Sequence, residues 1–205
     1  MNINGYQNQD FRTIPSLWPN LEGVTILDIG CGVGLYSNAL VQRGARVIGV
    51  DFERENLRLA QKNDTTGLGV WVCADARHLP FKETSFAMVI SVEVLTHLPP
   101  DAMRCVILEM ARVAVDGAAV YLTLHNKTRL DLRAWVGGRT PTPFYQTSNL
   151  DVWPARLDDA LDMVRDCGLE LVTRPRYLNF YSRFSMTFVC KYPFVARCLA
   201  ALEEI

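Results

Sequence analysis

Residues 24–34, Val24-Thr-Ile-Leu-Asp-Ile-Gly-Cys-Gly-Val-Gly34, decide the fold of this chain of 205 residues. A short apolar run leads directly into glycines, and the residues from Leu35 to Arg43 then have the apolar spacing of a helix that Gly44 would end. A continuous apolar run of this length is typical of a strand buried on both faces of a sheet. We therefore predict a buried strand, a tight turn and a helix that packs back on the sheet.

The alternation of strands and helices continues toward the C-terminus. Further strands are predicted at 45–50, 70–74, 86–91 and 118–124, and further helices at 53–63, 100–115 and 157–167. This order implies right-handed crossovers and a parallel sheet covered on both faces. The β-rich runs 169–177 and 184–192 are separated by too few residues for a helix, so we expect them to form an antiparallel hairpin. The predicted architecture is a three-layer α/β sandwich.

Composition excludes several classes of protein. Apolar residues make up 49% of the chain, which excludes a mainly disordered protein, and a net charge of −1 argues against broad binding to nucleic acid. The six cysteines form no C-x-x-C pair, and no apolar run approaches the ~18 residues of a membrane span. The N-terminal residues 1–10 are polar and contain no apolar h-region, so we expect no secretory signal. We expect one cytoplasmic domain over residues 1–205, with no membrane span.

The glycines follow a parallel strand, and the carboxyl ends of such strands are where open α/β sheets bind ligands. Glycine lets a ligand approach bare backbone, although a tight turn without a ligand is the alternative. A dinucleotide fingerprint requires a third small residue where Leu35 stands, and Asp28 would repel a pyrophosphate. The turn therefore favours an ammonium-bearing ligand over NAD.

Two carboxylates close the next two predicted strands. Asp51 follows Gly30 by 21 positions, the place from which a carboxylate binds both hydroxyls of an adenosine ribose. Its alternative role is to cap the helix at 53–63. Asp75 closes the third strand, where it would accept a hydrogen bond from an adenine amine or remain a solvated loop acid.

Four motifs stand in order along the first 125 residues. They are residues 24–34, Gly49-Val-Asp51, Ala74-Asp-Ala76 with Leu79-Pro80-Phe81, and Phe86-Ala-Met-Val-Ile-Ser-Val-Glu-Val-Leu-Thr-His-Leu98. In this order and spacing they resemble the class I S-adenosylmethionine-dependent methyltransferases, in their small-molecule, type 11-like branch. The resemblance implies a Rossmann-like sandwich with a seven-stranded, mostly parallel sheet whose last strand is antiparallel.

The resemblance also implies S-adenosylmethionine as cofactor, S-adenosylhomocysteine as product, and three groups of contacts. The methionine moiety would lie against the glycine turn and the end of the fourth strand, at Asp28, Gly30, Cys31, Gly32, Gly34, Ser91 and Val92. The ribose hydroxyls would bind Asp51. The adenine would meet Phe52 on its face and Asp75 with Ala76 at its edge.

The chain departs from the family pattern in two places. The N-terminal cap, residues 1–22, is short, although its Tyr6 has an aromatic face that would attract a sulfonium if it is not a disordered leader residue. The fourth strand ends in Ser91-Val-Glu-Val94 and lacks the Asn/Asp-Pro-Pro-Tyr sequence of enzymes that methylate nucleic-acid amino groups. We therefore expect a small-molecule acceptor and no nucleic acid.

A hydroxyl or ammonium acceptor must lose a proton, which favours a nearby base with a pKa near neutrality. The candidates are His97 and Glu93, beyond the fourth strand, and His125, at the end of the fifth. Each has an alternative role: His97 as a packed, hydrogen-bonded residue, His125 as a strand cap, and Glu93 as the partner of an amine.

Residues 126–156 form a long stretch rich in proline and aromatic residues, which we interpret as a substrate lid. The region 127–197 carries 11 basic and 7 acidic residues. Those in the lid before residue 145 are Lys127, Arg129, Arg133 and Arg139, against Asp131. They favour an anionic acceptor, because arginine and lysine form strong hydrogen bonds with carboxylates and phosphates. A solvated basic face or a contact with another subunit is the alternative.

The sequence thus predicts methyl transfer from S-adenosylmethionine to an oxygen or nitrogen of a small metabolite. No carboxylate cluster stands at the ends of strands four and five, so we expect no metal requirement. A catalytically silent cofactor-binding subunit remains the main alternative, and a nicotinamide-dependent oxidoreductase the weaker one.

Overall fold

The computed structural model describes residues 20–146, 151–172, 176–177 and 185–191. Nearly all of the expected N-terminal cap, including Tyr6, lies outside these ranges, as do the side chains of Arg129 and Arg133 in the expected lid.

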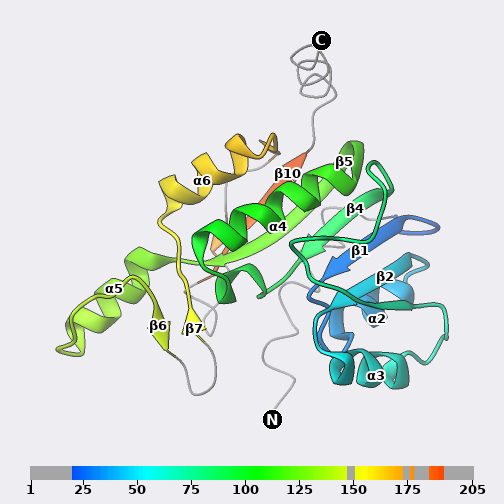
Figure 1. Cartoon of the computed structure of the whole chain (residues 1–205), viewed down its shortest axis with the longest axis horizontal. Coiled ribbons are helices and arrows are strands. Elements are labelled where there is room, and N and C mark those ends of the chain that lie inside the picture. The colour runs from blue at the N-terminus through cyan, green and yellow to red at the C-terminus, as the bar shows by residue number, and fades with distance from the viewer. Residues whose placement is uncertain (1–19, 147–150, 173–175, 178–184, 192–205) are drawn as a thin grey trace.

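Five parallel strands form the body of the molecule (Figure 1). They are β1 (Thr25–Ile29), β2 (Arg46–Asp51), β3 (Val70–Cys73), β4 (Phe86–Ser91) and β5 (Ala114–His125), in the spatial order β3-β2-β1-β4-β5. The order reverses beside β1, because the chain runs outward through β2 and β3 and then returns to β4. The carboxyl ends of β1 and β4 therefore flank the point at which such sheets bind ligands.

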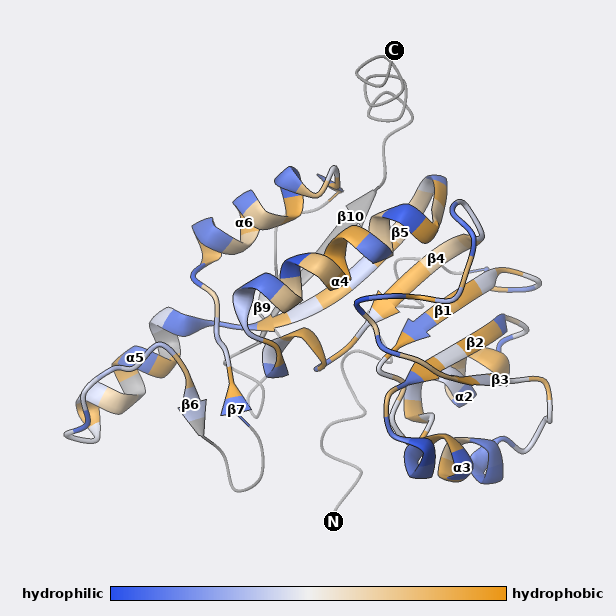
Figure 2. Cartoon of the chain, viewed as in Figure 1, coloured by the Kyte–Doolittle hydropathy of each residue, from blue (hydrophilic) through white to orange (hydrophobic). Residues whose placement is uncertain are grey.

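Helices cover both faces of the sheet, in three layers (Figure 1). The connecting helices are α2 (Leu35–Val41), α3 (Arg54–Asn63), α4 (Pro100–Val113) and α6 (Leu157–Asp166). Successive residues of one strand enter opposite cores: Ile26 packs in the cluster that contains Leu40 of α2, whereas Leu27 packs in the cluster of Ile107 of α4. Both faces are therefore apolar, and Figure 2 shows the central strands as mainly hydrophobic.

The C-terminal edge of the sheet has one strand more than expected. Strand β10 (Ser185–Lys191) lies antiparallel to β5, and it pairs on its other side with β8 (Glu170–Leu171) and β9 (Arg176–Tyr177). The predicted strand 169–177 is divided into β8 and β9. Their partners on β10, Cys190 and Met186, are four positions apart, whereas Leu171 and Tyr177 are six positions apart. The described sheet thus contains eight strands and not seven.

The boundary between α4 and β5 also differs from the prediction. The helix ends at Val113, and β5 begins at Ala114, before the Asp116-Gly117 pair that was expected to separate them. Phe86 pairs with Ala114, whereas Met88 pairs with Ala119, so three extra residues of β5 form a bulge that includes this pair.

The stretch 126–156, expected to be irregular, contains regular structure. A helix, α5 (Lys127–Val136), is followed by β6 (Tyr145–Gln146) and β7 (Asp151–Val152), which pair with each other. Lys127 and Asp131 form an ion pair of 2.9 Å one turn apart along the helix. The sequence did not predict this helix, because its apolar residues do not lie on one face: Ala134 is buried, whereas Trp135 and Val136 are exposed.

Candidate functional site

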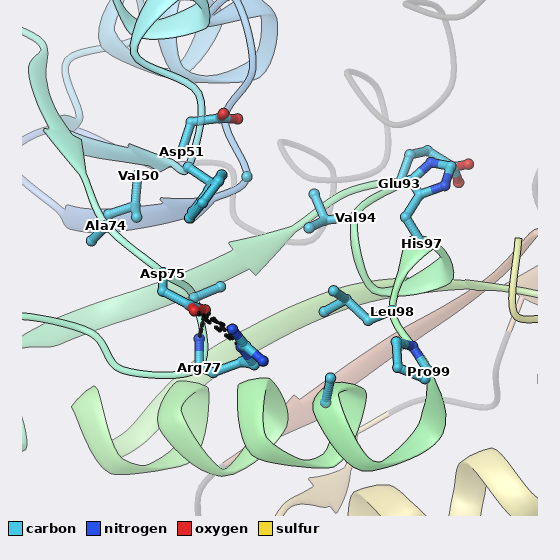
Figure 3. A pocket seen from close by; sticks show the side chains of 14 residues that line it. Val50, Asp51, Ala74, Asp75, Arg77, Glu93, Val94, His97, Leu98 and Pro99 are labelled. Carbon is cyan, nitrogen blue, oxygen red and sulfur yellow. Dashed lines mark hydrogen bonds and ion pairs between the residues drawn. The ribbon is translucent and has the colours of Figure 1, made fainter. Parts of the chain in front are cut away.

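A pocket of about 630 Å³ opens at the carboxyl ends of the parallel strands. Asp51 and Asp75 lie at one end of it and Glu93 and His97 at the other, in the view of Figure 3. Its size falls within the ~300–1,000 Å³ typical of sites for small molecules. The pocket therefore joins two groups of polar residues that the sequence assigned to different roles.

The glycine turn supports the floor of this pocket. The N–H groups of Gly30 and Cys31 both donate to the carbonyl of Val50, at 2.7 and 2.9 Å, which ties the turn to the end of β2. Gly30 has φ +71°, and a Cβ atom there would stand 2.2 Å from Cγ2 of Val94. Only glycine fits, because the backbone is left-handed and the space beside it is already filled.

Asp51 stands at the pocket wall with three protein donors on its carboxylate. Oδ2 accepts from the N–H of Gly32 at 2.9 Å, and Oδ1 accepts from the N–H of Glu53 at 2.8 Å and from Nδ2 of Asn56 at 3.2 Å. The local role before α3 and a ligand role can coexist, since a carboxylate has about four acceptor positions. A ribose diol would displace or share the longest contact, that with Asn56.

The residues assigned to adenine surround the same end of the pocket. Phe52 is 71% exposed, an aromatic face left open at the pocket rim, and Ala76 also lines it. Asp75 forms a two-pronged ion pair with Arg77, whose Nη2 lies 2.6 Å from Oδ2, and this holds the pKa of Asp75 down to about 2. The carboxylate is therefore charged, and an adenine amine would share it with Arg77.

Asp28 is close to this site but does not reach the pocket. Its side chain is buried beneath the turn and accepts a hydrogen bond of 2.6 Å from the hydroxyl of Ser37. Burial raises the pKa of Asp28 to about 6, because the charged form is deprived of water. Asp28 therefore holds α2 beneath the turn, and its expected role toward a methionine moiety, through backbone or water contacts, stays a prediction.

Four other residues expected near the methionine moiety do not line the pocket. Cys31 is buried, and burial raises the pKa of its thiol, so it remains a neutral packing group. Gly34 is the N-cap residue of α2 and does not line the pocket. Ser91 and Val92 are buried behind the pocket wall, and the Ser91 hydroxyl has no hydrogen-bond partner among the described residues.

Glu93 reaches the pocket through an unusual backbone conformation. Its φ of +57° is uncommon outside glycine, and its N–H donates 2.7 Å to the hydroxyl of Thr123 on β5. Its carboxylate Oε2 lies 2.9 Å from Nε2 of His125. Two of the three predicted base candidates are thus joined directly, with Glu93 on the pocket and His125 behind it.

His97 lies in a turn of 3₁₀ helix (Leu95–His97) on the same side of the pocket as Glu93 (Figure 3). Its Nδ1 lies 3.0 Å from the carbonyl oxygen of Asp151 on β7. The neighbouring Thr96 carbonyl accepts from the N–H of Trp153 at 2.7 Å. Part of the expected lid is therefore hydrogen-bonded to the loop that carries His97.

Sequence reasoning missed Thr123, Arg77 and the residues of β7. Arg77 could have been found, because it follows Asp75 by two positions and such neighbours reach each other locally. Thr123 and Asp151 lie 30 and 54 positions from their partners, and no local pattern marks contacts at that separation.

The basic residues of the expected lid do not line this pocket where their side chains are described. Arg139 lies in a second pocket, of about 680 Å³, with Phe144 and Tyr145. Lys127 is held by Asp131 and by the carbonyl of Thr142.

The residues present fit an adenosine-bearing sulfonium cofactor. Phe52 offers an open aromatic face, Asp51 a charged acceptor, and Gly30 a backbone without a side chain where the pocket passes the turn.

Among the described side chains, no group of three or more His, Cys, Asp or Glu is placed to hold a metal ion. No helix in the described ranges is long and apolar enough to cross a membrane.

Comparison with known sequences agrees with this geometry. Residues 27–122 match the model of a methyltransferase domain. A ubiquinone biosynthesis O-methyltransferase of Paracidovorax citrulli is 30% identical over 168 residues, which cover 73% of this chain and 68% of that protein. The corresponding protein of Hahella chejuensis is 35% identical over 113 residues, 52% of this chain and 45% of its own length. The match thus spans less than half of several of these relatives.

Comparison with solved structures identifies the same fold. The magnesium protoporphyrin IX methyltransferase of Synechocystis PCC 6803, solved with bound S-adenosylhomocysteine, superposes with a TM-score of 0.73 at 24% identity and covers 89% of this chain and 82% of its own. A methyltransferase of Methanosarcina mazei gives 0.73 at 22% identity, with 87% and 97% covered. The fold, the ordered motifs and the similarity to the P. citrulli protein together show that this chain belongs to the class I S-adenosylmethionine-dependent methyltransferases.

Proposed function

We propose that this protein transfers the methyl group of S-adenosylmethionine to an oxygen of a small-molecule metabolite. The observation that carries the proposal is the shape of the pocket, which runs from Asp51 and Phe52 to Glu93 and His97. One end has the groups that suit an adenosine, and the other has groups that can take up a proton.

The cofactor end would act by binding and orientation. When bound, S-adenosylmethionine supplies a methyl carbon that carries a good leaving group, so alignment accounts for much of the acceleration. Asp51 would accept the ribose hydroxyls, Phe52 would cover one face of the adenine, and Gly30 would let the methionine part approach the turn. Arg77 would keep Asp75 ionised at the adenine edge.

The acceptor end supports oxygen as the methylated atom. A hydroxyl needs a base, and this end of the pocket has His97 and the Glu93–His125 pair. The relatives from P. citrulli and H. chejuensis are named as O-methyltransferases. Transfer to nitrogen remains the alternative and would use Glu93 as the partner of an amine.

The segment 126–156 would act as the lid of the acceptor site, with residues 1–22 as a short cap on the cofactor. Arg139 would then contact a carboxylate or phosphate of the acceptor from its exposed position beside Phe144. Arg139→Gln should in that case raise the acceptor's KM and leave the affinity for S-adenosylhomocysteine unchanged. An uncharged acceptor used equally well by both proteins would exclude this contact.

The proposed function is tested by calorimetry with S-adenosylhomocysteine, followed by incubation with methyl-labelled cofactor and a small-metabolite extract. We expect micromolar binding and label in a small molecule, with Asp51→Asn as the weakened control. Binding without transfer would indicate a silent subunit, whereas binding of a nicotinamide cofactor in its place would indicate an oxidoreductase. Activity that a chelator abolishes and magnesium restores would contradict the expected independence from metals.

A further inference from the structure

Residues 151–155 of the expected lid, here called the strap, form hydrogen bonds at or beside both candidate histidines. At its start, the Asp151 carbonyl lies 3.0 Å from Nδ1 of His97. At its end, the N–H of Ala155 donates 2.9 Å to the carbonyl of His125, and the Ala155 carbonyl accepts from the N–H of Lys127. Between them, Val152 is buried and the N–H of Trp153 is bonded to the Thr96 carbonyl. The strap is thus fixed at both ends and in the middle.

The contact between the strap and His97 determines which ring nitrogen carries the proton. A carbonyl oxygen can only accept a hydrogen bond, so Nδ1 of His97 must be the donor. In the neutral ring the lone pair then resides on Nε2. His97 lines the pocket, and no described residue forms a hydrogen bond with its Nε2. His97 therefore lines the pocket with one ring nitrogen held by the strap and a basic nitrogen that no described residue occupies.

The other two candidates are arranged differently. His125 lies outside the pocket lining, and its Nε2 is already bonded to Glu93 at 2.9 Å. Glu93 is fixed at its N–H by Thr123 and at its carboxylate by His125. The Glu93–His125 pair is therefore suited to holding the pocket wall in place. Among the three candidates, His97 is the one whose basic nitrogen has no hydrogen bond to a described residue.

We propose that His97 Nε2 is the general base and that the strap, through the Asp151 carbonyl, fixes the tautomer that makes it one. This inference rests on the proposed methyl transfer to oxygen. In that step the acceptor's O–H bond breaks and its proton passes to Nε2, giving an imidazolium. The oxygen's electron pair forms the new bond to the methyl carbon, and the pair of the breaking carbon–sulfur bond stays on sulfur. His97 is catalytic in this scheme, and the strap has a positioning role.

The consequence is that the hydrogen bond to the strap favours the tautomer that can act as the base. Without the Asp151 acceptor, the neutral His97 ring would carry its proton on either nitrogen. With the proton on Nε2, that nitrogen is a donor and cannot accept a proton from a hydroxyl.

The tautomer can be measured without any acceptor or cofactor. The chain has three histidines, so long-range ¹⁵N–¹H spectra of ¹⁵N-histidine-labelled protein at a pH where the rings are neutral contain three ring patterns. His97→Asn identifies the His97 pattern by its disappearance. We expect the wild type to show the proton on Nδ1 of His97. A proton on Nε2, or an even mixture of the two tautomers, would overturn the assignment.

Two substitutions in the strap separate the main chain from the side chain. Asp151→Ala keeps the carbonyl and should leave the His97 pattern unchanged. Trp153→Pro removes the N–H that binds Thr96 and should shift His97 to a mixture of tautomers. A changed pattern in Asp151→Ala, or an unchanged one in folded Trp153→Pro, would refute the role of the strap. If Trp153→Pro does not fold, the wild type and Asp151→Ala still decide, because the Nε2–H pattern in either contradicts the proposal.

Activity provides an independent check. His97→Gln should lower labelling of the metabolite extract by roughly 10²–10⁴-fold, the usual contribution of a general base, and leave binding of S-adenosylhomocysteine unchanged. Normal labelling by His97→Gln would overturn the catalytic role. Absence of binding and of labelling in the wild type would instead refute the proposed function, whatever the tautomer of His97.

Discussion

Replacing Gly30 by alanine should destabilise the protein for two separable reasons. The first is the backbone, because φ of +71° costs a non-glycine residue roughly 1–2 kcal/mol. The second is the new Cβ, which would stand 2.2 Å from Cγ2 and 2.8 Å from Cγ1 of Val94. Overpacking of this kind typically costs roughly 1–3 kcal/mol. We therefore expect Gly30→Ala to lower the free energy of unfolding by about 2–5 kcal/mol.

Gly32 is a matched control within the same turn. Its φ is +53°, but apart from its chain neighbours no atom of a described residue lies within 4 Å of the position that a Cβ would take. Gly32→Ala should therefore lower the free energy of unfolding only through the backbone, by roughly 1–2 kcal/mol. Val94→Ala offers a second comparison, since it removes both methyl groups that the new Cβ would meet.

Urea denaturation of the wild type, Gly30→Ala, Val94→Ala and Gly30→Ala/Val94→Ala gives the four corners of a double-mutant cycle, and Gly32→Ala is measured beside it as the backbone control. The double variant should recover roughly the 1–3 kcal/mol of the steric contribution. Equal destabilisation by Gly30→Ala and Gly32→Ala, or strictly additive effects of the Gly30 and Val94 substitutions, would refute this reasoning.

Three further predictions concern charged groups. Asp51→Asn should weaken S-adenosylhomocysteine binding by roughly 1–3 kcal/mol in calorimetry, whereas Glu53→Gln should leave it unchanged; equal affinities of the two variants would contradict the role of Asp51. The folded-state pKa of Asp28, raised to about 6 from 3.8, favours the protonated form, so its contribution to stability is complete below pH 4 and is lost as the pH rises through 6. In denaturation experiments, the free energy of unfolding should fall by about 3 kcal/mol between pH 4 and 7, and Asp28→Asn should abolish this fall. If the variant keeps the pH dependence of the wild type, Asp28 is not its source. Arg112→Ala should cost roughly 1–3 kcal/mol of unfolding free energy, because Arg112 binds Glu109 and two loop carbonyls, while Arg104→Ala at an exposed pair should cost less than ~1 kcal/mol; equal thermal melting points would disprove the difference.

Local patterns were enough to predict the parallel core and several of the residues that line the pocket. The apolar runs at β1, β2 and β4 are mainly buried, and β3 is a partly exposed edge strand whose apolar composition was still enough to mark it. The turn after β1 was marked by its glycines, which have positive φ angles. Asp51, Phe52, Ala76, Glu93 and His97 were all placed on the pocket for a similar reason. Asp51 ends β2, and the others lie between one and six residues beyond the end of a strand; strand ends of a parallel sheet share one edge.

Contacts between distant segments could not be predicted in this way. The bond from Glu93 to Thr123 depends on the exact register of β4 and β5, which a bulge of three residues shifts. The contact between His97 and Asp151 depends on α5 and β6, and neither was expected from the sequence. The burial of Asp28 could not be predicted either, because a motif gives spacing but not burial.

The position of β10 between β5 and β8 has a consequence for synthesis of the chain. Residues 119–125 of β5 pair on one side with Ser185–Lys191, which leave the ribosome much later, and only residues 119–122 of this stretch also pair with β4. At ~5–20 residues per second, the 60 positions from His125 to Ser185 take roughly 3–12 s. Throughout that interval β5 is an unpaired edge strand, the kind of surface that pairs with other chains. Nascent chains stalled before residue 185 should therefore aggregate, and those stalled well beyond residue 191 should not.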